Sequence, residues 1–90
     1  MKWEKKLGYK INFKRSVSKD LKRIDKKYAR IILEKIEKDL PNTAANLPEL
    51  QGQFAGLRKY RIGNYRVIFI IINDEILILR IEHRKGVYKK

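Results

Sequence analysis

Cysteine is absent from this 90-residue chain, and histidine occurs once, as His83. The absence of cysteine excludes disulfide bonds and thiolate metal sites. A single histidine excludes a zinc site built from several histidines of one chain. We therefore expect neither a metal ion nor a cofactor.

Long apolar segments are also lacking. The longest uninterrupted apolar run is Val67–Ile72, whereas a membrane-spanning helix needs about 20 such residues. The N-terminal stretch Met1–Gly8 has no apolar core of the kind found in secretory signals, and we expect it to form a short extension. The length allows one domain, residues 1–90, with no room for a second core. These features predict a soluble, cytoplasmic protein.

Acidic residues are few. The chain has 10 of them against 23 lysines and arginines, which gives a formal net charge of +13. Such an excess destabilises a compact state by self-repulsion and indicates a nucleic acid, an anionic membrane or an acidic protein as partner. Because 43% of the residues are hydrophobic, a packed core is expected in spite of the charge.

The first part of the chain predicts one strand and two helices. Residues 9–13 alternate apolar and polar side chains, which is typical of a short half-buried strand. A helix capped by Ser16 or Ser18 should follow and run to about Ile24. Its inner stripe should consist of Val17, Leu21 and Ile24.

A second helix is expected from about Lys26 to Leu40, antiparallel to the first. Asp25 is its candidate cap, and Pro41 is expected to end it because proline disfavours helical geometry in the preceding residue. Its apolar positions recur with a period near 3.6. They are Tyr28, Ile31, Ile32, Lys35 (through its aliphatic stem only), Ile36 and Leu40.

The second part of the chain predicts a three-stranded antiparallel meander. Residues 41–56 form a loop in this interpretation, and the strands are Leu57–Ile62, Tyr65–Ile72 and about Ile76–Glu82. The middle strand is apolar on both faces at its far end, so it should be central and covered. The predicted fold class is α+β, in the order β-α-α-β-β-β, with both helices on one face of the sheet.

The hairpin at Gly63-Asn64 places cations opposite one another. With these two residues as the loop, Arg61 pairs with Arg66 and Lys59 pairs with Ile68. Side chains alternate along a strand, so Lys59, Arg61 and Arg66 should emerge on one side. Like charges directly opposite destabilise a sheet, and we interpret the cluster as a phosphate-binding site.

The register of the last strand has two alternatives. A loop at Asp74-Glu75 would place His83 opposite Arg66, in one row with Arg61, and this register is favoured. A slip by one residue would instead place Ile81 opposite Arg66 and turn His83 to the other face.

Two segments resemble the RelE/ParE superfamily of prokaryotic toxins. Residues 57–69 contain an Arg-x-Gly-x-Tyr-Arg hairpin that begins at Arg61, and residues 81–88 contain a His-Arg-x-x-x-Tyr tail that begins at His83. Residues 13–24 are similar to the first helix of that family, and Leu50–Gly52 is similar to its loop before the hairpin. The resemblance implies a fold like that of microbial ribonucleases and a cognate acidic antitoxin as partner.

The resemblance also implies roles for individual residues. Lys59 matches a lysine proposed as general base, and Arg61 and Arg66 match arginines that hold phosphate. Tyr88 matches a tyrosine that stacks on an mRNA base. The family's catalytic C-terminal arginine falls nearest Arg84 with a small gap, or at Glu82 without one. Leu57 departs from one branch, which carries a second active-site lysine at that position.

For the RelE branch, the resemblance implies cleavage of mRNA in the ribosomal A site. RNA can be cut without a metal when its 2′-hydroxyl attacks the adjacent phosphorus, and arginine suits the phosphate because its planar fork holds two oxygens. His83 is a candidate acid or base. Other basic side chains are expected to bind RNA phosphates. They are Arg58, Lys85, Lys22 and Lys26.

Two rival interpretations stay open. A ParE-like toxin inhibits DNA gyrase and cuts no RNA, and Leu57 leaves room for it. A non-catalytic nucleic-acid-binding module would use the basic surface alone. In either case Lys59 could be a solvated edge lysine, and the arginines could bind antitoxin carboxylates instead of RNA.

Overall fold

A computed structural model describes residues 9–50, 52 and 55–83. The predicted Arg84, Lys85 and Tyr88, and the Met1–Gly8 extension, lie outside the described residues. The elements follow in the order β1 Lys10–Phe13, α1 Arg15–Lys22, α2 Lys26–Thr43, the 3-10 turn η1 Ala44–Asn46, β2 Leu57–Ile62, β3 Tyr65–Ile72 and β4 Glu75–His83. The predicted α+β fold is confirmed.

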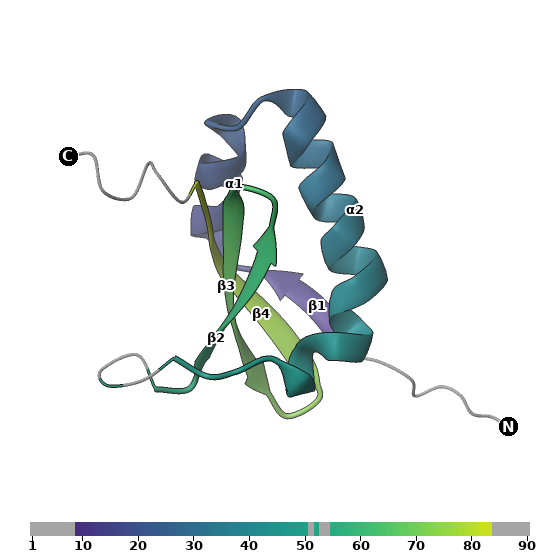
Figure 1. Cartoon of the computed structure of the whole chain (residues 1–90), viewed down its shortest axis with the longest axis vertical. Helices are drawn as coiled ribbons and strands as arrows, with labels where there is room; N and C mark the ends of the chain where they lie inside the picture. The colour runs from purple at the N-terminus through teal and green to yellow at the C-terminus, as the bar shows by residue number, and fades with distance from the viewer. Residues whose placement is uncertain (1–8, 51, 53–54, 84–90) are drawn as a thin grey trace, which may run out of the picture.

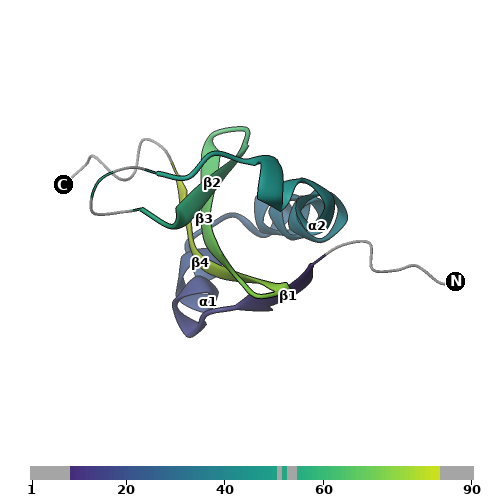
Figure 2. The ribbon, with the colours of Figure 1, turned by 90° about the horizontal axis from the view of Figure 1, so that it is seen from below.

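The four strands form one sheet in the order β1-β4-β3-β2, in which β1 is parallel to β4 and the other pairs are antiparallel. The apolar strand β3 is central, as predicted. Helix α2 lies across one face of the sheet, and α1 lies beside β4, as Figures 1 and 2 show. Among the described helices, none is both long and apolar enough to cross a membrane.

The core lies between α2 and the sheet. Ile32, Ile36 and Leu40 of α2 are fully buried against strand residues that include Phe69. Val17 of α1 is also buried, and Leu21 and Ile24 are partly buried against the core, as predicted. The helix ends at Lys22, however, so Ile24 lies just beyond it. Two residues of the apolar pattern of α2 remain outside the core, because Tyr28 is 50% exposed and Ile31 is 40% exposed. The buried stripe of α2 is therefore narrower than its apolar pattern.

The helix ends differ from the prediction. Lys14, not a serine, is the N-cap residue of α1; the hydroxyl of Ser16 instead donates to the Leu79 carbonyl, and that of Ser18 to the Arg15 carbonyl. Asp25 is the N-cap residue of α2, yet its side chain makes no capping bond to any described residue. Pro41 does not end α2. It lies inside the helix, which continues for two more residues to Thr43.

At Arg66 the register of β4 matches neither predicted alternative, although His83 does lie on the other face, as the slipped register predicted. Asn73 adopts a left-handed conformation with φ +57°, so the turn is Asn73-Asp74 and Ile72 pairs with Glu75. A shift between Ile68 and Phe69 then leaves Leu79 as an extra residue in β4, as in a β-bulge. Beyond it, Arg66 pairs with Glu82 and Tyr65 with His83. The predicted row of Arg61, Arg66 and His83 is therefore wrong.

The bulge has a packing reason. Without the extra residue, Arg80 would pair with Val67 on the buried face and Ile81 would point to the opposite face. With it, Ile81 is 2% exposed, and it joins Ile76 and Ile78 in the core. Burial of three isoleucines on one face thus favours the bulge, which in turn sends Arg80 and Glu82 to the other face.

Candidate nucleic-acid interface

The sheet face opposite α2, here called the open face, has none of the described helices over β2 and β3, while α1 lies along its β4 side (Figure 2). Pairing across β2, β3 and β4 arranges its side chains in three rows. The first row is apolar, the second is mixed, and the third is charged. The rows are Leu57–Ile70–Leu77, Lys59–Ile68–Arg80 and Arg61–Arg66–Glu82.

The prediction that Lys59, Arg61 and Arg66 emerge on one side is confirmed. Arg61 lies directly opposite Arg66, and Lys59 lies in the adjacent row of β2. The tight turn at Gly63, with φ +58°, sets this register. Since two cations face each other across neighbouring strands, this part of the open face attracts anions.

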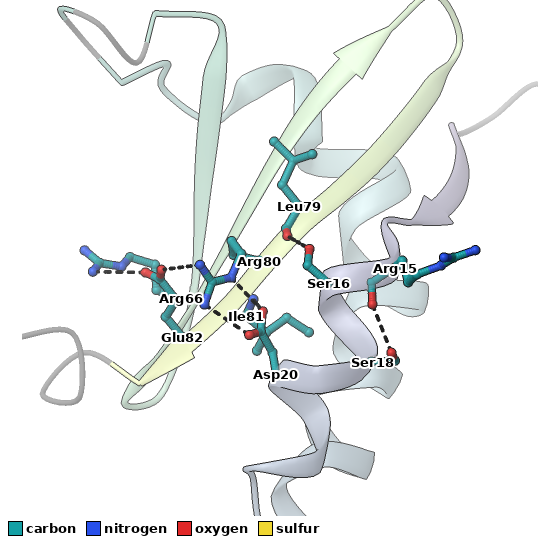
Figure 3. A network of polar contacts seen from close by, with 9 residues as sticks. All are labelled: Arg15, Ser16, Ser18, Asp20, Arg66, Leu79, Arg80, Ile81 and Glu82. Atoms are coloured by element: carbon teal, nitrogen blue, oxygen red, sulfur yellow. Dashed lines mark hydrogen bonds and ion pairs between the residues drawn. The ribbon is translucent and has the colours of Figure 1, made fainter.

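Glu82 occupies the third position of the charged row, where the predicted register placed His83. One of its carboxylate oxygens, Oε1, lies 3.4 Å from Nη2 of Arg66, and the other, Oε2, lies 3.8 Å from Nη1 of Arg80. Figure 3 shows the carboxylate between the two guanidinium groups. The side chains of Arg66 and Glu82 are 21% and 23% exposed, so both remain within reach of a ligand.

Arg66 keeps donors for a further ligand. Its Nε is buried and donates to no acceptor among the described residues. Its Nη2 contact with Glu82 is longer than the 2.7–2.9 Å that is typical of strong charge-assisted bonds. The guanidinium is therefore incompletely satisfied, as expected of a group that binds an exogenous anion.

Asp20 is a structural residue that the sequence did not reveal. Its carboxylate, 8% exposed, accepts hydrogen bonds from Nε and Nη2 of Arg80, at 2.9 and 3.1 Å, and from the backbone N–H of Ile81 at 2.9 Å. The bond to Asp20 raises the pKa of the Arg80 guanidinium. Asp20 thus accepts the hydrogen bond of a backbone N–H at the edge of β4, beyond the end of β1, and it positions Arg80. An acid between Val17 and Leu21, on the inner stripe, was the available signal.

His83 lies on the α2 side of the sheet, not in the charged row, because it pairs with Tyr65. The two rings make an edge-on contact with centroids 4.9 Å apart, and Tyr65 lies 6.3 Å from Tyr28. A cavity of about 540 Å³ adjoins them between the end of α1 and the end of β4. It is lined by Asp20, Arg23, Ile24, Tyr65, Arg80, Ile81, Glu82 and His83. Glu82 is therefore common to the cavity and the charged row.

Arg58, a predicted RNA-binding residue, also points to the α2 side, because it pairs with Phe69. Its guanidinium donates to the carbonyls of Ala45 and Leu47 and contacts Glu49. These bonds hold the segment after α2 against β2. The structure therefore separates Arg58 from the cations of the open face.

Tyr60 fixes the strand β2 from the α2 side of the sheet. Its hydroxyl donates to Oδ2 of Asp39 on α2 at 3.0 Å. Burial, together with this bond and the charge of Asp39, raises the pKa of Tyr60 to about 12. The bond ties β2 to α2, so the strand that carries Lys59 and Arg61 is fixed to the core.

The remaining predicted residues lie apart from the charged row. Lys22 ends α1 and Lys26 begins α2, and both are exposed. Among the described side chains, no group of three or more His, Cys, Asp or Glu is placed to hold a metal ion. The chemistry that the described site offers is that of arginine, lysine and a carboxylate.

Comparisons with known proteins agree with this geometry. A family model described as the ParE toxin of a type II toxin–antitoxin system, parDE, matches residues 11–88. Toxin RelE3 of Methanocaldococcus jannaschii is 27% identical over 84 residues, which cover 88% of this chain and 94% of the relative.

Solved structures are similar as well. The toxin–antitoxin complex RelBE2 from Mycobacterium tuberculosis contains a chain with a TM-score of 0.80 and 25% identity, covering 86% of this chain and 99% of that one. The archaeal RelE–RelB complex from Pyrococcus horikoshii gives a TM-score of 0.62 and 28% identity, covering 86% and 96%. The family match spans the whole open face. The chain is a toxin of the RelE/ParE family, from a type II toxin–antitoxin system.

Proposed function

We propose that this toxin is an endoribonuclease that cuts mRNA in the ribosomal A site. The observation that carries the proposal is the gathering of Lys59, Arg61 and Arg66 on the open face of the sheet. A ribonuclease that acts without a metal must bind the scissile phosphate and stabilise the charge that develops on it. Preorganised cations on a rigid sheet meet that requirement, and one well-placed donor contributes roughly 2.7–4 kcal/mol to such a transition state.

In this proposal the arginines bind the phosphate and Lys59 takes part in proton transfer. Arg66 lies on the central strand, so its backbone is held on both sides by hydrogen-bonded neighbours. Arg61 approaches the same phosphate from β2. The 2′-hydroxyl attacks phosphorus and displaces the 5′-oxygen, so no metal is needed.

The named relatives support a RelE-like activity and an antitoxin partner. Toxin RelE3 carries the RelE name, and the two similar solved structures are complexes with antitoxins. The net charge of +13 favours an acidic antitoxin. The apolar row Leu57–Ile70–Leu77, which lies beside the cations, offers that antitoxin a hydrophobic contact. The toxin would act in the cytoplasm, where ribosomes are found.

The test uses ribosomes programmed with a defined mRNA, followed by primer extension. The expected result is a cut within the A-site codon on ribosomes and much slower cutting of the same mRNA alone. No cut on ribosomes at any toxin concentration would refute the endoribonuclease proposal.

A ParE-like function is the second candidate, and two observations favour it. The matching family model is that of ParE toxins, and Leu57 stands in the apolar row beside Lys59 where a RelE branch has a lysine. Inhibition of gyrase supercoiling by the purified toxin, without mRNA cleavage, would establish this alternative.

A further inference from the structure

The charged row contains one carboxylate among its cations. Arg61 on β2, Arg66 on β3 and Glu82 on β4 lie side by side across three adjacent strands. The extra residue Leu79 brings Glu82 to this face, and the Leu79 carbonyl is itself held by the Ser16 hydroxyl at 2.9 Å. A carboxylate in an anion-binding site weakens phosphate binding, so its placement there calls for a chemical reason.

We propose that Glu82 is the proton acceptor that activates the 2′-hydroxyl during RNA cleavage. This inference rests on the proposed endoribonuclease function and names the base for it. A carboxylate is ionised at neutral pH without any special environment, since glutamate has a reference pKa near 4.3. A lysine can accept a proton only after its pKa is lowered from a reference value near 10.4. The role of base therefore suits Glu82 better than Lys59.

Glu82 contacts two arginines, but both contacts are long. Arg66 holds one carboxylate oxygen at 3.4 Å and Arg80 holds the other at 3.8 Å. Arg80 is in turn fixed by two bonds to Asp20 of α1. Because the contact with Arg66 is long, an RNA phosphate can displace the carboxylate from that guanidinium. Glu82 then stays beside the bound phosphate because its position on β4, paired with Arg66 of β3, is fixed by the sheet; its 3.8 Å contact with Arg80 is longer still and does not hold it.

The charges around Glu82 are mixed. Arg66 faces it from β3 and Arg80 from its own strand, while the cavity next to it also carries Asp20 and Arg23 from the α1 end and His83 from β4. The cavity opens beside the carboxylate, so there is room for a nucleotide next to the proposed base.

The cleavage step balances with groups on the open face. The 2′-hydroxyl proton passes to Glu82 as the 2′-oxygen bonds to phosphorus. The bond from phosphorus to the 5′-oxygen breaks, and the Lys59 ammonium gives that oxygen a proton. The products are a 2′,3′-cyclic phosphate and a 5′-hydroxyl. Proton transfer from Glu82 to Lys59 through solvent then restores the starting state.

The arrangement of strands fits an in-line displacement. The attacking and leaving oxygens lie on opposite sides of phosphorus in such a step. Glu82 lies on β4 and Lys59 on β2, on opposite sides of Arg66 on the central strand β3. Adjacent strands are about 4.8 Å apart, so a phosphate at Arg66 has the acceptor on one side and the donor on the other.

A purely electrostatic role for Glu82 predicts the opposite effect of mutation. If the carboxylate only neutralises Arg66 and Arg80, then Glu82→Gln frees two cations for phosphate, and cleavage stays equal or becomes faster. If Glu82 is the base, the same variant binds the ribosome at least as tightly but cuts more slowly. A lost general base lowers the rate on the order of 100- to 10,000-fold.

The experiment measures single-turnover cleavage of mRNA on programmed ribosomes, with toxin binding measured separately. It compares wild type, Glu82→Gln, Glu82→Asp and the control Glu75→Gln, which removes an exposed carboxylate from the other end of β4. We expect Glu82→Gln to cut at least about 100-fold more slowly with binding not weakened, and Glu75→Gln to cut like wild type. If the wild type cuts the mRNA and Glu82→Gln cuts it equally fast or faster, the inference is overturned and the proposed function stands.

Two further outcomes are decided in the same experiment. A wild type that cuts nothing overturns the proposed function itself, and the inference with it. If Glu82→Gln melts well below the control, the decision passes to Glu82→Asp, which keeps the charge. A base set back by one methylene slows cleavage on the order of 10- to 100-fold, whereas an unchanged rate in that variant overturns the inference.

Discussion

Replacement of Asp20 by alanine should destabilise the fold strongly, although Asp20 lies outside the charged row. The substitution removes the acceptor of the Ile81 N–H, which is a buried bond at 2.9 Å. An unsatisfied buried donor costs about 1–3 kcal/mol. The ion pair with Arg80 adds about 1 kcal/mol at most, because the Arg80 side chain is 48% exposed and can be solvated again. The free energy of unfolding should therefore fall by about 1–4 kcal/mol.

The measurement is urea unfolding of the purified toxin, followed by circular dichroism. Asp20→Asn should fall between wild type and Asp20→Ala, because it keeps an oxygen for the Ile81 N–H but loses the charge. Asp25→Ala is the matched control, because Asp25 is exposed and its side chain caps nothing in the described structure; it should change stability by less than about 0.5 kcal/mol. A value for Asp20→Ala within about 0.5 kcal/mol of wild type would refute the assigned role of Asp20.

Three other predictions follow from the structure. In an ultraviolet titration, one tyrosine should titrate near pH 12, and Tyr60→Phe should remove that transition. Because the pKa of Tyr60 is raised in the folded state, its contribution to stability is complete below about pH 10 and is lost as the pH rises toward 12. Gly63→Ala should destabilise the toxin by about 1–2 kcal/mol, all from its φ of +58°, since a Cβ there would meet nothing within 4 Å; an unchanged midpoint in urea would contradict this. RNA binding should weaken with salt, and Arg66→Ala should reduce the slope of log K against log salt by about 0.7, the value for one phosphate contact on a single strand; an equal slope would exclude Arg66 from phosphate contact.

Much of the fold was predictable because its signals are local. Alternation and turn residues placed β2 and β3 at the observed bounds, and the loop Gly63-Asn64 fixed their pairing. The cations Lys59, Arg61 and Arg66 could be assigned to one face for the same reason. Period-two geometry and a tight turn leave a hairpin little freedom.

The pairing of β4 was not predictable in the same way, because it depends on tertiary packing. The turn at Asn73-Asp74 and the extra residue Leu79 together shift the register, and the shift is favoured by burial of Ile81. A signal did exist in the spacing of Ile76, Ile78 and Ile81, which changes from two to three. Because this change of spacing was not used, His83 was predicted in the charged row, where the structure has Glu82.

Helix details failed for a related reason. Ser16 lies near the start of α1, where sequence rules predict a cap, but its hydroxyl finds a carbonyl in β4 that only the folded chain provides. Asp20 was overlooked because burial of a carboxylate is expected only where partners satisfy it, and both of its partners are remote in sequence.

The central claim is that the cations of the open face bind the target of the toxin. The direct measurement compares two double variants for growth arrest after induction. Lys59→Ala with Arg66→Ala removes two charges from the open face, and Lys35→Ala with Lys38→Ala removes two from the exposed surface of α2. We expect the first variant to lose toxicity and the second to arrest growth like wild type. Equal arrest by both, at equal protein levels, would contradict the claim.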